Sequence, residues 1–389
     1  MNAKRPIGIA VAGLGSAARM MLPSLQDHPR WKLSAITDID RDTLASVADM
    51  TGARASVDLD AMLAAPDVDV VYIATPTLLH ATHVRAAAAA GKHVIVEKPM
   101  AETASAALAM IEAAERAGIF LIVGHSRSFD IAIRRMREII AAGTLGRPRM
   151  IQSTVYTDWI YRPRRPDELD PDQGGGVIFR QGAHQFDVIR LLGGGMLKNV
   201  RASLFDMDAS RAAVGAHSVF LSFEDGAAAT AVYNGYGCFM TSELCFGVGE
   251  RGFEDPVEGL GAARRAYLAR SGGSEDGLKR VRAAGQARGI PPHHPFFGLT
   301  LVSCEAGDLR QAPDGLFLYT ARGREHIPFP PERNVYDAVL AEMAQAIDSD
   351  TRPLHDGRWG LANLEVCEAS LRSARSGTEQ ALVRQVPVR

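Results

Sequence analysis

The sequence predicts an α/β protein, with a doubly wound parallel sheet in its first domain and a large, mostly antiparallel open sheet in its second. Two observations support this prediction. Up to about residue 125, short apolar segments alternate with helical segments, as in βαβ units. From Val200 to Phe329 the chain consists mostly of strand segments separated by turn residues, which is typical of an antiparallel sheet in an α+β domain.

Length and patterning predict two domains, residues 1–125 and residues 126–389. The second domain carries a polar, glycine-rich insertion at about 250–294 and closing helices at about 334–376. The formal net charge of −2 gives no basic field for nucleic acid or an anionic membrane. We therefore expect neither class of partner.

Location and metal content also follow from the sequence. No apolar run approaches the roughly 18 residues of a membrane-spanning helix. The N-terminus enters the first strand directly, without a signal-peptide core. The four cysteines lack C-x-x-C spacing and are expected to be free thiols of a cytoplasmic protein. His80 and His83, like His293 and His294, have no cysteine or carboxylate nearby to complete a metal set, so we expect no metal.

A glycine-rich turn follows the first predicted strand. The apolar run Ile7–Ala12 leads into Gly13-Leu-Gly15-Ser16-Ala17-Ala18 and then into an amphipathic helix. Strand, Gly-x-Gly-x-x-Ala and helix is the dinucleotide-binding pattern. Gly13 permits the tight turn, Gly15 lets the backbone approach a pyrophosphate, and the N–H groups of the helix start, at Ser16 and Ala17, face the phosphates.

The second predicted strand, Lys32–Thr37, ends in Asp38. This acid follows the glycine turn by about the 20 residues expected of the carboxylate that binds the adenosine ribose. A carboxylate accepts both ribose hydroxyls of NAD and repels a 2′-phosphate. Arg41 is near enough in sequence to soften that repulsion, so we predict NAD and do not exclude NADP.

The remaining elements follow in order. In the first domain we expect helices at 43–51, 80–90 and 103–117 and strands at 67–74, 93–97 and 119–123. In the second we expect helices at 130–142 and 177–192 and strands at 148–159, 218–223, 227–233, 299–305 and 315–320. Ligands of parallel sheets lie at the carboxyl ends of the strands, where Thr75, Glu97 and Lys98 fall.

Four motifs together resemble the glucose–fructose oxidoreductase / inositol dehydrogenase family (Gfo/Idh/MocA). They are Gly13-x-Gly15-x-x-Ala18, Ile73-Ala-Thr75-Pro76 with His80, Glu97-Lys98-Pro99, and Gly182-Ala-His184-Gln-Phe-Asp187. The resemblance implies a Rossmann domain, NAD(P)-dependent hydride transfer, and a homodimer or homotetramer built through the second sheet. It adds Thr75, Pro76, His80, Glu97 and Lys98 to the expected cofactor-binding residues.

Lys98 and His184 are the predicted catalytic residues. Removal of hydride from a carbinol carbon requires a base for the hydroxyl proton and a positive group for the developing alkoxide. Lys98, at the mouth of a parallel strand, suits the second role, and the resemblance places it near the nicotinamide. His184 matches the active-site histidine of the family, the usual proton acceptor.

Arg180 departs from the family pattern Asp-x-Gly-x-His-x-x-Asp. On a helix, positions 180, 184 and 187 share one face. Because guanidinium forks match carboxylates, Arg180 favours an anionic substrate over a neutral sugar. Arg127 and Arg164, with Arg162 and Arg165 beside the latter, are further candidate substrate-binding residues, together with Asp187. The alternatives are that Arg180 pairs with Asp187 or another internal acid and that the loop arginines are solvated.

The segment Phe179–Asp187 and the long insertion are most similar to the branch of the family that oxidises the cis-4,5-dihydrodiol of phthalate to 4,5-dihydroxyphthalate. The resemblance therefore implies a dehydrogenase for a carboxylate-bearing carbinol substrate. Two alternatives remain open. One is a family member that acts on a sugar, polyol, sugar acid or semialdehyde. The other, of a different class, is a non-catalytic dinucleotide-sensing regulator.

Overall fold

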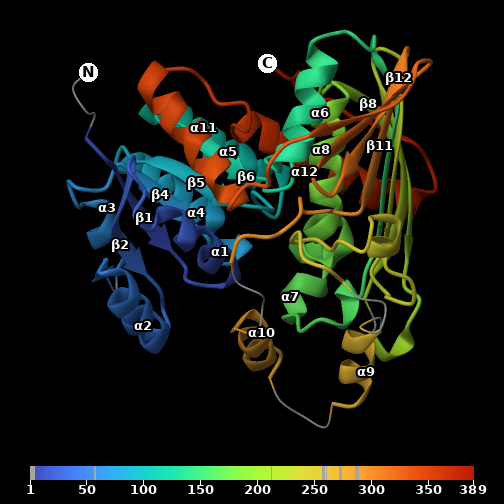
Figure 1. Ribbon diagram of the computed structural model, residues 1–389. Coiled ribbons are helices and arrows are strands. Elements are labelled where there is room, and N and C mark those ends of the chain that lie inside the picture. Colours follow the sequence, from blue (N-terminus) through green and yellow to red (C-terminus); the bar gives the residue numbers. More distant parts are fainter. Residues whose placement is uncertain are drawn as a thin grey trace. The chain divides into compact units, whose positions relative to one another are not determined.

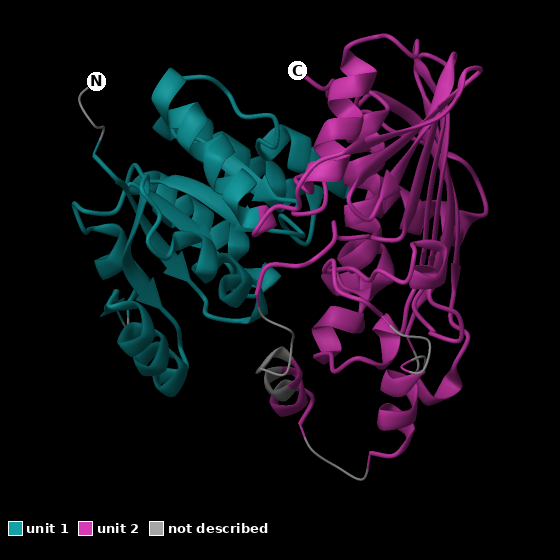
Figure 2. Cartoon of the chain, in the orientation of Figure 1, with its two compact units in different colours: residues 1–125, 336–364 teal, residues 126–335, 365–389 magenta. Residues whose placement is uncertain are grey.

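The structure of the chain, a computed structural model, describes residues 5–56, 58–211, 213–255, 259, 261–270, 274–284 and 289–389. It forms two compact units (Figure 2). Unit 1 contains the residues up to His125 and the segment Tyr336–Leu364, and unit 2 contains Ser126–Val335 and Glu365–Arg389. The sequence places residues 336–364 in the second domain. They belong to unit 1 because this segment packs on its sheet, where Val123 N donates to His355 O at 2.9 Å.

The sheet of unit 1 has six parallel strands in the order β3-β2-β1-β4-β5-β6 (Figure 1). Their bounds are Ile7–Ala12 for β1, Trp31–Thr37 for β2, Arg54–Ser56 for β3, Val70–Ile73 for β4, His93–Glu97 for β5 and Leu121–Gly124 for β6. This is the order of a Rossmann sheet, whose ligands bind where the order reverses, between β1 and β4. The parallel sheet predicted from the sequence is confirmed.

The helices of unit 1 begin and end at residues with clear local signals. They are α1 (Ser16–Leu25), α2 (Arg41–Thr51), α3 (Leu59–Leu63), α4 (Thr77–Ala89), α5 (Ala104–Ala117) and α11 (Val335–Ser349). The Asp40 carboxylate caps α2 by accepting from Asp42 N and Thr43 N, and Thr103 caps α5 through Ala106 N. Both helices end at a left-handed glycine, Gly52 or Gly118.

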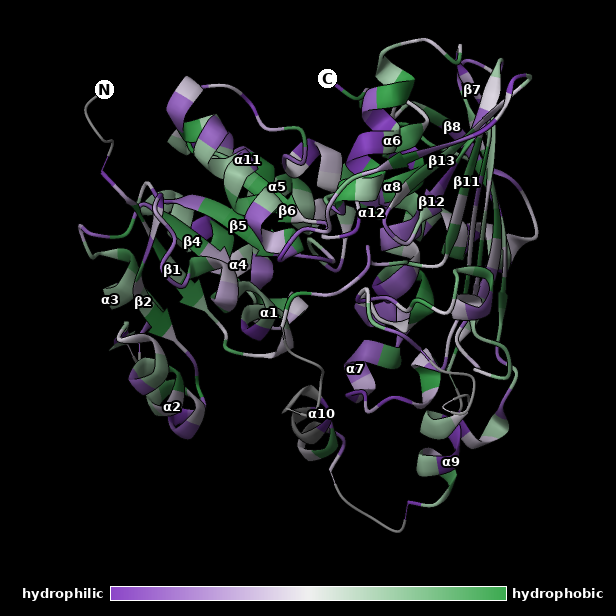
Figure 3. Ribbon diagram, viewed as in Figure 1, coloured by the Kyte–Doolittle hydropathy of each residue, from purple (hydrophilic) through white to green (hydrophobic). Residues whose placement is uncertain are grey.

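The central strands of unit 1 are apolar throughout. Every residue of β1, β4 and β6 is buried, and the hydrophobic colouring of Figure 3 can be followed along them. A parallel sheet covered by helices on both faces has no solvated side, so its strands are continuous apolar runs rather than alternating ones. This is why β1 could be located from the sequence with the observed bounds.

Unit 2 is built on a mixed sheet of nine strands in the order β14-β13-β12-β11-β7-β10-β9-β8-β15. The bounds are Pro148–Tyr156 for β7, Leu197–Phe205 for β8, Ala216–Phe223 for β9, Ala228–Asn234 for β10, Leu299–Cys304 for β11, Gly307–Ala312 for β12, Gly315–Thr320 for β13, Gly323–Pro328 for β14 and Gln380–Ala381 for β15. Strands β7 and β10 pair in parallel and the other neighbouring pairs are antiparallel. The mostly antiparallel sheet predicted from the sequence is confirmed.

The helices of unit 2 are α6 (Ile131–Ala141), α7 (Pro166–Leu169), α8 (Ala183–Leu192), α9 (Ala262–Leu268) and α10 (Glu275–Ala284), and α12 (Gly357–Ser376) enters it from unit 1. All residues of α8 are buried. The prediction of one regular helix over 177–192 was wrong in one respect, because Ile178–Gly182 form a π-helical turn before α8. Such turns are rare and occur frequently at functional sites.

The insertion at 250–294 contains helices α9 and α10 within its described residues. No helix was predicted there from the sequence, and in the structure long-range ion pairs anchor α10. Lys279 Nζ lies 2.7 Å from Glu168, and Glu275 lies 2.8 Å from Arg211. Over the described part of the chain, no helix combines the length and the hydropathy required to cross a membrane.

The turn after β1 gives a first testable prediction. Gly13 has φ +87°, and a Cβ there would lie 2.8 Å from the backbone of Ala74 and Thr75. Gly13→Ala should therefore lower the free energy of unfolding by about 2–3 kcal/mol, measured by urea denaturation. A Cβ at Gly15 meets no atom within 4 Å. Gly15→Ala should cost less than about 1 kcal/mol of stability.

A comparison of Gly13→Ala with Gly15→Ala distinguishes an effect on stability from an effect on cofactor affinity. Gly15→Ala should still weaken NAD binding at least about tenfold, measured by calorimetry, because its methyl group occupies the place of the pyrophosphate. Equal losses of stability in the two variants would contradict this account of the turn.

Candidate active site

The glycine turn and Asp38 form one hydrogen-bonded group. Leu14 N donates to Asp38 Oδ2 at 2.6 Å, and Asp40 N donates to Asp38 Oδ1 at 2.8 Å. These bonds fix the carboxylate beside the turn and leave further lone pairs for ribose hydroxyls. The open space at Gly15, the N–H groups of Ser16 and Ala17 at the start of α1, and the placed acid fit a dinucleotide.

His80 joins the loop after β4 to the loop after β5. Its Nε2 lies 2.9 Å from Thr75 O, and its Nδ1 lies 3.0 Å from Pro99 O. His83 instead contacts Thr75 Oγ1 at 3.1 Å. These contacts suit His80 to positioning the loops that carry Thr75, Pro76 and Lys98. Among the described side chains, no group of His, Cys, Asp or Glu residues could hold a metal ion.

Glu97 anchors the backbone of Lys98. Its Oε1 accepts from Tyr72 Oη at 2.6 Å and from Tyr336 Oη at 3.1 Å, and its Oε2 accepts from Lys98 N at 3.3 Å. Burial and the Glu97 carboxylate raise the pKa of Tyr72 well above its usual range, so this phenol stays a neutral donor. We predicted Glu97 as a cofactor-binding residue, but the contacts described here fix the position of Lys98.

His184 and Asp187 lie on α8 and Arg180 lies on the π-helical turn before it. His184 and Asp187 are buried, whereas Arg180 is partly exposed. The His184 ring makes an edge contact with Phe297, with 5.2 Å between the ring centroids. Phe297 precedes β11, so sheet pairing brings it from far along the chain to the predicted catalytic histidine.

Gln185, the neighbour of His184, fixes α8 to the sheet. Its amide nitrogen donates to Ser153 O at 3.1 Å and to Val232 O at 3.1 Å. Because that nitrogen donates, Gln185 Oε1 is left as the acceptor of His217 Nε2–H at 2.8 Å. Burial lowers the pKa of His217 to about 3, so its imidazole is neutral.

Arg127 and Arg162 converge on Glu250. Arg127 lies 4.9 Å above the Phe297 ring and donates from Nη1 to Glu250 O at 2.9 Å. Arg162 pairs with Asp158 at 2.7 Å and lies 3.6 Å from Glu250 Oε2. Burial acts to raise the pKa of Glu250, but Arg162 and Arg127 outweigh it and hold that pKa below its usual value. The Glu250 carboxylate thus offsets the positive charges of Arg127 and Arg162 close to Phe297.

Arg164 lies in the same region and has a different environment. Its guanidinium stacks 4.6 Å above Trp159, and its backbone N donates to Glu275 Oε2 on α10 at 2.7 Å. Its Nε is buried and has no hydrogen-bond partner among the described residues. Burial lowers the pKa of Arg164 to about 10, which still leaves it charged near neutral pH.

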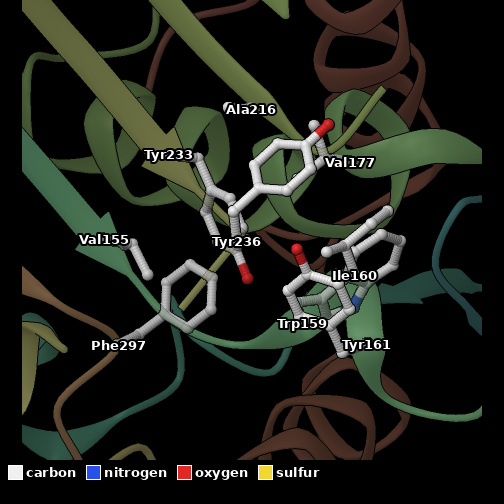
Figure 4. Close-up of a cluster of buried hydrophobic side chains, with 9 residues drawn as sticks. All are labelled: Val155, Trp159, Ile160, Tyr161, Val177, Ala216, Tyr233, Tyr236 and Phe297. Carbon is white, nitrogen blue, oxygen red and sulfur yellow. The ribbon is translucent and has the colours of Figure 1, made fainter. Parts of the chain in front are cut away.

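Phe297, Trp159, Tyr233 and Glu250 were not among the predicted site residues. The first three belong to one buried aromatic cluster (Figure 4). Strand pairing makes the cluster, because Tyr233 on β10 lies opposite Val155 on β7. No local sequence signal marks such residues. Glu250 opens the insertion, and its sequence gave no indication of a contact with Arg127.

Comparison with known proteins agrees with this architecture. Residues 7–125 match the model of an oxidoreductase family with an NAD-binding Rossmann fold, and residues 133–240 match the GFO/IDH/MocA C-terminal domain. The chain is 40% identical over 380 residues to a Comamonas testosteroni protein named 1-carboxy-3-chloro-3,4-dihydroxycyclohexa-1,5-diene dehydrogenase, which covers 94% of each chain.

Two solved structures are also similar. A crystal structure from Bordetella bronchiseptica RB50 has a TM-score of 0.90 at 36% identity and covers 97% of this chain and 100% of its own. An Agrobacterium radiobacter oxidoreductase in complex with NAD+, L-tartaric acid and magnesium has a TM-score of 0.73 at 19% identity, covers 97% and 98%, and shows the fold alone.

The chain is an NAD-dependent oxidoreductase. It belongs to the Gfo/Idh/MocA family, as the two domain matches and the relative that spans nearly its whole length show. The family, the cofactor NAD and the enzymatic nature expected from the motifs are confirmed, and the sensor alternative is not supported.

The buried His217 gives a second prediction. Its pKa is lowered from 6.5 to about 3 on folding, so the unfolded chain takes up the proton first as the pH falls. The free energy of unfolding should therefore be unaffected by His217 above about pH 6.5. Through His217 alone it should be about 2 kcal/mol lower at pH 5. Urea denaturation at pH 7.5 and pH 5.0 measures this loss.

The variant His217→Gln isolates that contribution. It removes the titrating group, so its stability should decrease less between the two pH values than that of the wild type. Identical decreases would show that other groups are responsible for the acid sensitivity.

Proposed function

We propose that this protein dehydrogenates a cyclohexadiene cis-diol that bears a ring carboxylate, with NAD as the oxidant. Arg180, one turn before His184 at a position where the family pattern has an acid, is the observation that carries this proposal. Arg127 and Arg164 support it from the same unit. The name of the Comamonas testosteroni relative describes such a substrate, a dihydroxycyclohexadiene with one carboxyl group.

Lys98 and His184 have different roles at the substrate hydroxyl that is oxidised. NAD, when bound, would supply the hydride acceptor. His184 takes the hydroxyl proton, and the ammonium group of Lys98 stabilises the negative charge that develops on that oxygen. Glu97 holds the backbone of Lys98 for this task. The product is a hydroxy-ketone whose enolisation gives an aromatic catechol, which makes the oxidation strongly downhill.

The substrate carboxylate has three candidate partners, Arg180, Arg127 and Arg164, and Asp187 is proposed as an acceptor for a substrate hydroxyl. The guanidinium groups match a carboxylate in charge and in geometry. The cis-4,5-dihydrodiol of phthalate and a ring diol with one carboxylate both fit this class. A sugar acid or semialdehyde is the second candidate, which the same arginines would also favour over a neutral polyol.

We also propose that the protein forms a homo-oligomer through the second sheet. The face of that sheet opposite α8 exposes large apolar side chains, with Met150, Phe205 and Phe220 each more than two-fifths exposed. Large exposed apolar surfaces mark protein interfaces. Light scattering that gives the 41.8 kDa mass of one chain would contradict this proposal.

A substrate panel tests the proposed activity. NADH formation should be fastest with carboxylated cis-diols, the phthalate diol and the monocarboxylate among them, and slow with neutral cis-diols and polyols. Arg180→Gln should raise the KM for carboxylated diols about tenfold to a hundredfold, because a charge-assisted hydrogen bond is lost. Its KM for a neutral diol should be unchanged.

Lys98→Ala is the control for the panel. It should lower turnover about 10²–10³-fold on every substrate, because it removes charge stabilisation at the reacting oxygen. Its effect on NAD binding, measured by calorimetry, should be small. Activity on neutral polyols alone would refute the assignment to anionic diols.

A further inference from the structure

Tyr233 is a buried phenol with an unusual environment. Its side chain is fully buried in the aromatic cluster, and its Oη has no hydrogen-bond partner among the residues that the structure describes. Tyr236 in the same cluster is different, because its Oη accepts from Met207 N at 2.9 Å and also contacts Ala213 O at 3.1 Å. Buried polar atoms are nearly always paired, so the lone hydroxyl of Tyr233 requires an explanation.

The groups near Tyr233 favour an anion as its missing partner. Arg162 is balanced by Asp158 and Glu250, and Arg127 contacts Glu250 as well. Arg164 stacks on Trp159, which belongs to the same cluster as Tyr233, and its Nε has no hydrogen-bond partner among the described residues. The carboxylate of Glu168, which is paired with Lys279, also acts on the Arg164 charge. Burial and nearby Glu250 raise the pKa of Tyr233 well above its usual range, so it remains a neutral donor. Because Glu168 is shared with Lys279 and the Arg164 Nε is unpaired, a ligand carboxylate would give this guanidinium a partner of its own.

The aromatic cluster connects these groups to His184. Phe297 belongs to the cluster with Tyr233 and Trp159, and its ring contacts both the His184 ring and the Arg127 guanidinium. Flat aromatic walls next to an arginine with an unpaired nitrogen suit a planar ring that bears a carboxylate.

We propose that Tyr233 and Arg164 form the carboxylate subsite of this enzyme, with Trp159 and Phe297 as its aromatic walls. The proposal rests on the proposed function for the identity of the natural substrate. It goes further by assigning the ring carboxylate to a phenol and a guanidinium that no motif marks. Arg162 already faces Asp158 and Glu250, and Arg127 faces Glu250, so the subsite itself offers one guanidinium for one carboxylate, and a second ring carboxylate would fall to Arg180.

Calorimetric binding of benzoate to the NAD-loaded protein tests the subsite, with benzamide as its neutral counterpart. The wild type should bind benzoate at least tenfold more tightly than benzamide. Tyr233→Phe should weaken benzoate binding about tenfold, and Arg164→Gln should weaken it about a hundredfold, whereas benzamide binding should change less than threefold in either variant.

The tyrosine pair supplies a matched control. Tyr233→Phe removes an unpaired hydroxyl and should leave the melting temperature unchanged or raise it. Tyr236→Phe removes a paired hydroxyl and should lower the melting temperature without a change in benzoate affinity. If Tyr233→Phe melts lower than the wild type but binds benzoate equally well, Tyr233 is a structural residue and the proposal is wrong.

The outcomes for the subsite and for the proposed function are distinguishable. Benzoate binding that depends on Tyr233 and Arg164, together with no oxidation of any carboxylated diol, would retain the subsite and refute the proposed function. Oxidation of carboxylated diols with the wild-type KM in Tyr233→Phe and Arg164→Gln would retain the function and refute the subsite.

Discussion

The carboxylate of Glu97 is the interaction on which the chemistry of unit 1 depends. It closes a buried network in which Tyr72, from the middle of the sheet, and Tyr336, at the start of the closing helix α11, donate to one oxygen while the Lys98 backbone donates to the other. A buried carboxylate is tolerated only when such donors satisfy it. The sheet, the closing helix and the segment that carries Lys98, the predicted catalytic lysine, are therefore joined through a single side chain.

In unit 2 the side-chain amide of Gln185 has the equivalent role of joining several elements through buried hydrogen bonds. Gln185 bonds across β7 and β10 at their parallel junction and also binds His217 from β9, so α8 cannot rotate or slide without breaking several hydrogen bonds. His184 is the adjacent residue on α8, so the same hydrogen bonds hold its backbone in place. Catalytic side chains require support that holds them to within fractions of an ångström, and buried polar residues give such support to Lys98 and His184, the predicted catalytic residues.

The sequence predicted those features that depend on neighbouring residues. The glycine turn, Asp38, the fully buried strands and the capped helices have local signals, and the bounds of these strands and helices were predicted to within three residues. The π-helical turn, the closing segment that packs on unit 1, and helices α9 and α10 were not predicted, because long-range contacts and ion pairs determine them. Tyr233, Phe297 and Glu250 were missed for the same reason, since only strand pairing and the insertion bring them to His184 and the arginines.

Helix α10 fixes the backbone of the loop that contains Arg164, and this has a consequence for how members of the family diverge. Glu275 accepts a hydrogen bond from the backbone N of Arg164 and not from its side chain. The insertion therefore fixes the backbone at position 164 whichever side chain that position carries. Under the proposed function, substitutions in the insertion would change substrate choice without touching Lys98 or His184. Exchange of this segment between paralogues would then be a direct route to altered ring specificity.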